Sequence, residues 1–127
     1  MKRIFWISAS ILSICFLVAG IQVLRANAAY TIEATIINLG PGRMDDVIVH
    51  VTGNQYPLGS INLNSKAAAL VSASGESHIE ISYSDKGIPR RLVVNCYFEP
   101  GYKGRILIEL SNGKISKITD NIEIGKY

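Results

Sequence analysis

The stretch His78–Phe98, HIEISYSDKGIPRRLVVNCYF, decides the fold class of this chain. Its apolar residues alternate with polar ones on both sides of a central turn: Ile79, Ile81 and Tyr83 before it, and Ile88, Leu92, Val94, Cys96 and Phe98 after it. A period of two is typical of strands that bury one face. Pairing Tyr83 with Ile88 keeps both apolar sets on the same side, so the sequence predicts a β-hairpin with a four-residue loop at Ser84–Gly87.

The same pattern recurs along the rest of the chain. Alternation marks residues 30–36, 47–51 and 106–110, and Asn112-Gly113 is a strong hairpin-turn signal. Residues 54–63 hold a proline and a glycine and read as a loop with a short edge strand. In KAAALVSASG (66–75) the alanines favour a helix, but the flanking strands and Gly75 favour a strand. Residues 115–124 keep their alternation only with a bulge between Ser116 and Lys117.

Seven or so short strands, with turns about every 8–12 residues, predict one all-β domain over residues 29–127. We expect an antiparallel, immunoglobulin-like β-sandwich. Its most distinctive loop is EPGYKGR (99–105). The apolar register pairs Phe98 with Ile106, which sets Glu99 opposite Arg105 and leaves Tyr102 and Lys103 as exposed tips. Tyrosine is favoured at interfaces, so these two are candidate partner contacts.

A second candidate contact lies at the other end of the predicted sheet. Successive hairpin turns alternate between ends, so the turns at 84–87 and 111–114 share one. Lys86, Arg90 and Arg91 are the candidate contacts there. Lys114 and Lys117 gather beside them, opposed by Asp85 and Asp120. Such a basic end suits anionic lipid headgroups or an acidic partner.

The N-terminal 28 residues read as export machinery. Lys2 and Arg3 precede 21 residues, 4–24, without an acidic or basic side chain, which is long enough to cross a bilayer as one hydrophobic helix. Residues 26–28, Ala-Asn-Ala, have the form that signal peptidase cleaves. The chain is therefore either a single-pass inner-membrane protein with its C-terminal domain in the periplasm, or a secreted or periplasmic protein cleaved after Ala28.

The charges argue against nucleic acid as a partner. The chain has 13 Lys and Arg against 10 Asp and Glu, but three of the cations lie in the first 28 residues. The remainder therefore carries ten of each sign, whereas a nucleic-acid binder needs an excess of clustered cations.

Cysteine and histidine give no metal or disulfide pattern. Cys15 lies in the leader, and Cys96 is the only thiol of the domain, where its alternation predicts a core position. His50 and His78 are in no ligand-spaced motif, and no catalytic or nucleotide-binding motif is present. We expect no enzyme activity, no cofactor and no metal.

VIVHVT (47–52) after INLGPGRMDD (37–46), followed by the C-terminal meander, resembles the immunoglobulin-like and fibronectin-III-like sandwiches of small bacterial exported proteins. YFEPGYKG (97–104) is also similar to a segment of small bacterial envelope proteins. The first resemblance covers about residues 30–124 and rests on strand spacing, and the antibody-type Cys…Trp…Cys pattern is missing. It implies a sandwich fold and carries over no functional residue.

These observations give two hypotheses. The leading one is a non-enzymatic, membrane-tethered or exported module that binds another protein of the cell envelope, as a structural accessory or as an inhibitor or immunity partner. The alternative is a small-ligand or metal-binding envelope module that uses His50, His78 or Met44.

Overall fold

The computed structural model describes residues 31–125, so the predicted leader, its helix and its cleavage site lie outside the described residues. The described part is all-β, with nine strands and no helix, so none of its segments is a helix that could cross a membrane. The strands are β1 (Ile32–Asn38), β2 (Met44–Val51), β3 (Asn54–Ile61), β4 (Lys66–Val71), β5 (Ser77–Asp85), β6 (Ile88–Phe98), β7 (Tyr102–Ser111), β8 (Lys114–Asp120) and β9 (Glu123–Ile124).

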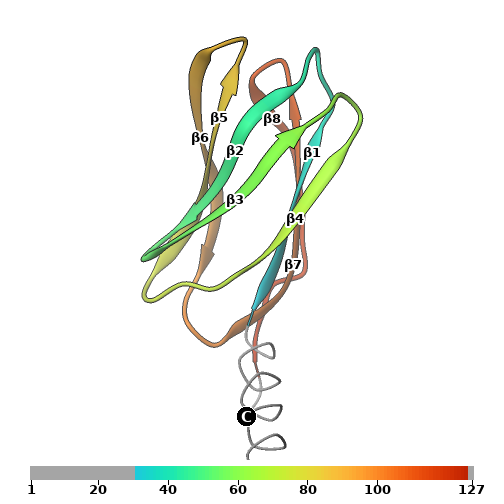
Figure 1. The fold of residues 1–127 in the computed structure, drawn as a ribbon. Coiled ribbons are helices and arrows are strands. Elements are labelled where there is room, and N and C mark those ends of the chain that lie inside the picture. The colour runs from blue at the N-terminus through green and yellow to red at the C-terminus, as the bar shows by residue number, and fades with distance from the viewer. Residues whose placement is uncertain (1–30, 126–127) are drawn as a thin grey trace, which may run out of the picture.

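The strands form two sheets that pack face to face as a β-sandwich-like fold (Figure 1). One, the β1–β7 sheet, has the order β4-β1-β7-β8, with β9 also paired to β7. The other, the β2–β5 sheet, has the order β3-β2-β5-β6. The predicted all-antiparallel arrangement is wrong in one place, because β1 and β7 run parallel.

The core lies between the two sheets and is aliphatic. Ile79 and Ile81 of β5 are fully buried, as the alternation predicted, and so is Phe98. Burying one such side chain stabilises the fold by about 1.5–3 kcal/mol. The buried apolar set is Ile32, Ala34, Ile36, Met44, Val47, Val49, Val51, Ile61, Val71, Ile79, Ile81, Tyr83, Val94, Phe98, Ile106, Ile108 and Leu110.

The β5–β6 hairpin is confirmed, but its register is not the predicted one. Asp85 pairs with Ile88, so the loop is the two residues Lys86 and Gly87 rather than four, and Tyr83 lies opposite Arg90. Both loop residues have positive φ, 50° and 80°. This tight turn matches the strand twist, and it leaves Ile88 exposed instead of facing the core.

Other local predictions are confirmed. Asn112 and Gly113, with φ of 52° and 71°, make the two-residue turn between β7 and β8. Glu109 pairs with Lys117 and Leu110 with Ile115, so Ser116 is the extra residue of the expected bulge. Residues 66–71 form strand β4, and β3, which contains a proline, is an edge strand.

The predicted hairpin across EPGYKGR is wrong. β6 belongs to the β2–β5 sheet and β7 to the other, so residues 99–101 carry the chain across the sandwich. Arg105 therefore lies opposite Glu33 of β1, with its Nε 3.8 Å from Glu33 Oε2, and not opposite Glu99. Alternation fixes only which side chains face inward, and that is the same for paired strands and for strands in opposing sheets.

Asn38 holds the connection from β1 to β2. Asn38 is almost completely buried, with only 1% of the residue exposed to solvent. The amide Nδ2 donates to the carbonyls of Gly42 (2.8 Å) and Ile61 (3.0 Å), and Oδ1 accepts from the Gly40 N–H (2.9 Å). One side chain thus satisfies three backbone groups where the chain passes from one sheet to the other.

Candidate partner-binding face

Polar side chains gather on the outer face of the β2–β5 sheet. His50 on β2 alternates with buried Val49 and Val51, and His78 and Glu80 on β5 flank buried Ile79, so the pleat turns the polar residues outward. Strand pairing then brings them together. His50 lies opposite Glu80, and Arg91 of β6 lies opposite Ser82.

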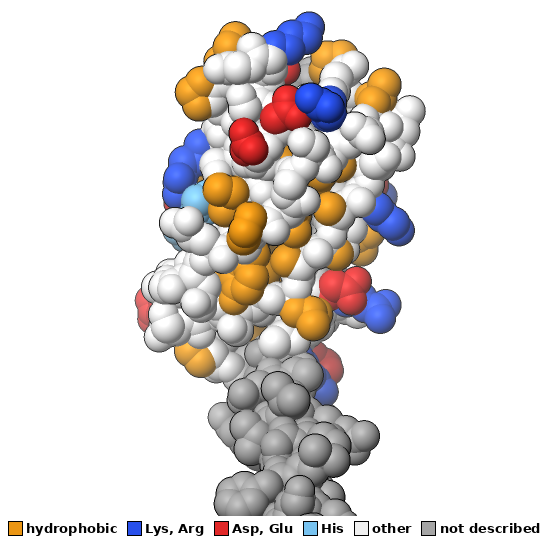
Figure 2. All heavy atoms as spheres, viewed as in Figure 1, with side chains coloured by type: hydrophobic (Ala, Val, Ile, Leu, Met, Phe, Trp, Pro, Cys, Tyr) orange, Lys and Arg blue, Asp and Glu red, His pale blue; other side chains and the backbone are white. Residues whose placement is uncertain are grey.

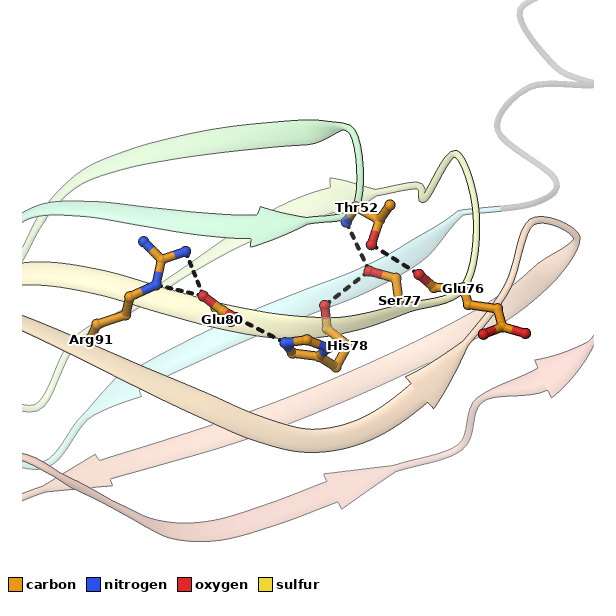
Figure 3. Close-up of polar contacts among 6 residues, drawn as sticks. All are labelled: Thr52, Glu76, Ser77, His78, Glu80 and Arg91. Carbon is orange, nitrogen blue, oxygen red and sulfur yellow. Dashed lines mark hydrogen bonds and ion pairs between the residues drawn. The ribbon is translucent and has the colours of Figure 1, made fainter.

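Glu80 is the centre of an ion-pair network (Figure 3). Its Oε1 lies 2.9 Å from His78 Nε2, and its Oε2 accepts hydrogen bonds from Arg91. The hydrogen bond from His78, followed by that from Arg91, lowers the pKa of the Glu80 carboxyl. Glu80 therefore stays ionised and holds the Arg91 guanidinium in one orientation on the surface.

His50 borders this network. Its Nε2 lies 2.7 Å from Ser82 Oγ. Partial burial, helped by the positive charge of Arg91, lowers the pKa of the imidazole, against an opposing effect of Glu80. At neutral pH His50 is therefore mostly uncharged, and Arg91 carries a permanent positive charge on this face. His50, His78, Glu80 and Arg91 also border one open hollow of about 180 Å³.

The start of β5 is pinned to the end of β2 beside the network (Figure 3). The Thr52 N–H donates to Ser77 Oγ at 2.8 Å, and Ser77 Oγ donates to the His78 carbonyl at 3.0 Å. Thr52 Oγ1 donates to the Glu76 carbonyl at 2.9 Å. These bonds fix the backbone that carries His78, so the histidine meets Glu80 from a rigid support.

Two exposed apolar side chains lie next to the network on β6, an edge strand. Val93, opposite Glu80, is 61% exposed, and Tyr97 is 55% exposed. The Tyr97 hydroxyl donates to a Glu99 carboxylate oxygen, and this bond raises the pKa of Tyr97 to about 12. Tyrosine and arginine beside exposed apolar area is the composition that protein interfaces favour.

Arg91 was predicted from the sequence as a contact residue, but its predicted position is wrong. Arg91 was expected at the end of the sheet, whereas it lies on the sheet face with Glu80. Lys86 and Arg90 do lie at the predicted end. Arg90 faces Asp85 at 3.8 Å, and Asp85, Arg90 and Lys114 line one hollow, which confirms that the two turns share an end.

Tyr102 and Lys103 are not the exposed loop tips that were predicted. β7 already begins at Tyr102, and β9 pairs with both residues. Tyr102 is half-buried, packs against the core and lines a hollow of about 430 Å³ together with Phe98 and Glu99. Lys103 Nζ lies 3.7 Å from Glu123 Oε1. β9, too short to stand out in the sequence, is what covers these two residues.

The remaining candidates lie apart from each other. Cys96 is half-buried against the core, near its predicted position, and burial raises the pKa of its thiol. Met44 is 5% exposed and lies at the opposite end of β2 from His50. Among residues 31–125 no three histidine, cysteine, aspartate or glutamate side chains come close enough to hold a metal ion.

Val93 and Tyr97 were not predicted as part of this face, and they leave only a weak signal in the sequence. Val93 and Tyr97 are apolar residues at positions of β6 that alternate with core residues, so the pattern marked them as outward. Their position relative to Glu80 depends on the β5–β6 register. The loop predicted from the sequence was two residues too long, which shifted that register by two residues.

The ion pairs of Glu80 predict a pH dependence. Because the folded state lowers the Glu80 pKa below 4.5, its contribution to stability is present above pH 4.5 and is lost as the pH falls through the lowered value. NMR titration should show the Glu80 carboxyl titrating below 4.5, and His78→Ala should move it back towards 4.5. His50→Ala, a control that removes a neighbouring histidine but neither of these hydrogen bonds, should move it less than His78→Ala does. A wild-type Glu80 that titrates at 4.5 or above would contradict the network.

Comparisons with known proteins assign this chain to no family. No protein-family model matches the chain, and no curated protein matches it significantly. A solved structure, the NMR structure of the protein from Eubacterium rectale, is similar over 76% of this chain and 92% of its own, with 13% identity and a TM-score of 0.46.

Proposed function

We propose that this chain is a non-enzymatic protein-interaction module of the cell envelope. It is held in the inner membrane by residues 4–24, with its C-terminal domain in the periplasm, or exported after cleavage following Ala28. Its fold is proposed to be an immunoglobulin-like sandwich, in keeping with the two packed sheets and short connections. It serves its partner as a structural accessory or as an inhibitor or immunity protein.

The observation that carries this proposal is the outer face of β5 and β6. Val93 and Tyr97 expose apolar surface beside Arg91, whose guanidinium is already oriented by Glu80. An oriented arginine loses little side-chain freedom on binding, so more of its interaction energy appears as affinity. A partner that covers Val93 and Tyr97 removes apolar area from water at the centre of the contact, which is where interface energy concentrates.

Site-specific crosslinking tests the proposal in the intact envelope. A photo-reactive amino acid at Val93 or Tyr97 should give one discrete crosslinked protein. The same probe at Leu70, which is 59% exposed on the outer face of the other sheet, should not. No crosslink at either β6 position, or the same products at Leu70, would contradict the proposal.

Affinity measurements then assign the energy to side chains. Once the partner is identified, Tyr97→Ala and Arg91→Ala should each weaken its binding by about tenfold or more, the range of interface hot spots. Arg105→Ala is the matched control, because Arg105 is also a surface arginine with one carboxylate partner, Glu33. Equal effects of Arg91→Ala and Arg105→Ala would show that this face is not the contact.

A further inference from the structure

Four connections meet at the end of the sandwich farthest from the start of β1, here called the distal end (Figure 1). They are residues 39–43, 62–65, 86–87 and 112–113. The Asn112 N–H donates to the Gly40 carbonyl at 2.9 Å, and a Cβ on Gly40 would come within 2.8 Å of Leu63 Cδ1. Pro41 and Lys114 line one hollow with Asp85 and Arg90. The connections therefore form one continuous surface.

The distal end exposes three large apolar side chains, two on these connections and one at the first residue of β6, next to the connection 86–87. Leu39 is 44% exposed, Leu63 is 47% exposed and Ile88 is 55% exposed. Leu39 and Leu63 belong to different connections, and Ile88 begins β6. Figure 2 shows orange apolar and blue basic side chains together at the upper end of the domain.

Basic side chains lie at the distal end together with these exposed apolar side chains. Within residues 31–125, Lys86 and Lys114 take part in no ion pair, whereas Arg43 and Arg90 face Asp45 and Asp85. The distal end holds five cations against three anions, net +2: Arg43, Lys66, Lys86, Arg90 and Lys114 against Asp45, Asp46 and Asp85.

The rest of the described domain has a negative net charge. It holds four cations against seven anions, net −3. Glu33, Glu99 and Glu123 lie towards the end at which residue 31 enters the fold. An anionic membrane next to that end therefore repels the body of the domain, while the distal end carries the attractive charge.

We infer that the distal end binds the surface of an anionic lipid bilayer. Separate apolar tips enter the headgroup region at a shallow depth, and unpaired lysines beside them contact the anionic headgroups. Since the tips lie opposite residue 31, a chain tethered by residues 4–24 presents them to a second bilayer surface and bridges the two. The bridging rests on the tether of the proposed function; the lipid contact does not involve the β6 face.

A vesicle-bridging assay with the full chain tests this inference. The chain is reconstituted in phosphatidylcholine vesicles, and energy transfer reports their capture of labelled acceptor vesicles. Acceptors of phosphatidylcholine and phosphatidylglycerol in equal parts should be captured, and capture should fall as salt is raised. Acceptors of phosphatidylcholine alone should be captured about tenfold less or not at all, because the lysines then lack anionic headgroups.

Variants assign the contact to the tips. Leu63→Ser with Ile88→Ser should reduce capture about tenfold, since two inserted aliphatic side chains are lost. Lys86→Glu with Lys114→Glu should abolish the salt-sensitive part. The matched control, Leu70→Ser with Leu107→Ser, changes two exposed leucines of the β1–β7 sheet, away from the distal end and from the β6 face, and should leave capture unchanged.

Three results would overturn the inference: equal capture of both acceptors, capture unaffected by the tip variants, or an equal loss in the control. Crosslinking of a protein at Leu63 without vesicle capture would make the distal end a protein contact instead. Arg91→Ala should leave capture intact, so failure of the partner proposal and failure of this one are distinguishable. If the mature chain proves to be cleaved, flotation of that chain with the same acceptors gives the same comparisons.

Discussion

Replacing Gly104 by alanine is expected to destabilise the domain by about 3 kcal/mol or more, a large fraction of the stability of a domain of this size. Gly104 has φ of +137°, a conformation that side chains rarely adopt. A Cβ there would lie 2.5 Å from the carbonyl oxygen of Asn121 and 2.9 Å from Cα of Ile122. These are backbone atoms, so the clash is not relieved by a rotamer change.

Neighbouring bonds hold the clashing backbone in place. The Asn121 N–H donates to the Arg105 carbonyl at 3.0 Å, and Asn121 Oδ1 accepts from the Arg105 N–H at 2.8 Å. On its other side, Gly104 pairs with Ile32 of β1. Chemical denaturation followed by circular dichroism measures the loss.

Gly75→Ala is the matched control for Gly104→Ala. Its φ is outside the left-handed region, and the nearest atom to its Cβ, Thr52 Cγ2, lies at 4.0 Å. We expect this variant to stay within about 0.5 kcal/mol of the wild type. If Gly104→Ala were as stable as Gly75→Ala, the close approach of the segment between β8 and β9 to β7 would be wrong.

Replacing Asn38 by alanine is expected to cost about 3 kcal/mol, because one buried and two partly buried backbone groups lose their partner at once. Ile61 is only 2% exposed, so its carbonyl then loses this partner out of reach of most solvent. Urea unfolding measures the loss in the free energy of unfolding.

Two further variants sharpen the Asn38 prediction. Asn38→Asp should be no better than Asn38→Ala at neutral pH, since a carboxylate can accept from Gly40 but repels the two carbonyl oxygens. Asn95→Ala, at an exposed asparagine, is the matched control and should change stability by about 0.5 kcal/mol or less. An Asn38→Asp variant as stable as the wild type would show that the amide donates no such bonds.

Local chemistry made part of the structure predictable. Asn112-Gly113 needs only its own preference for positive φ to set a two-residue turn, and the β8 bulge follows from the broken alternation at Ser116. Lys86-Gly87 adopts the same kind of turn, but lysine carries no preference for positive φ that would reveal it. The four-residue loop was therefore the simpler interpretation of the sequence. It shifted every β6 residue by two positions along β5, so that Arg91 lies opposite Ser82 rather than Glu80.

The candidate site was predictable only in fragments. Arg91 was identified as a contact residue, while Val93, Tyr97 and Glu80 were not associated with it, because their meeting depends on the strand register. Tyr102 and Lys103 seemed exposed because nothing in the sequence announces that β9, two residues long, returns to cover them.

The sequence by itself determined the all-β class, the inward face of nearly every strand and the Asn112-Gly113 turn, because these depend on alternation and on single residues. The tertiary structure decided which strands pair: β7 joins β1 in the opposite sheet rather than β6, because burial rewards an inward face and does not distinguish between two partners. It also decided the charge distribution. Ten cations and ten anions beyond residue 28 cancel in the sequence. Within residues 31–125 the fold separates the charges into a positive distal end and a negative remainder, because strand order places charges that are far apart in the chain on the same end of the domain.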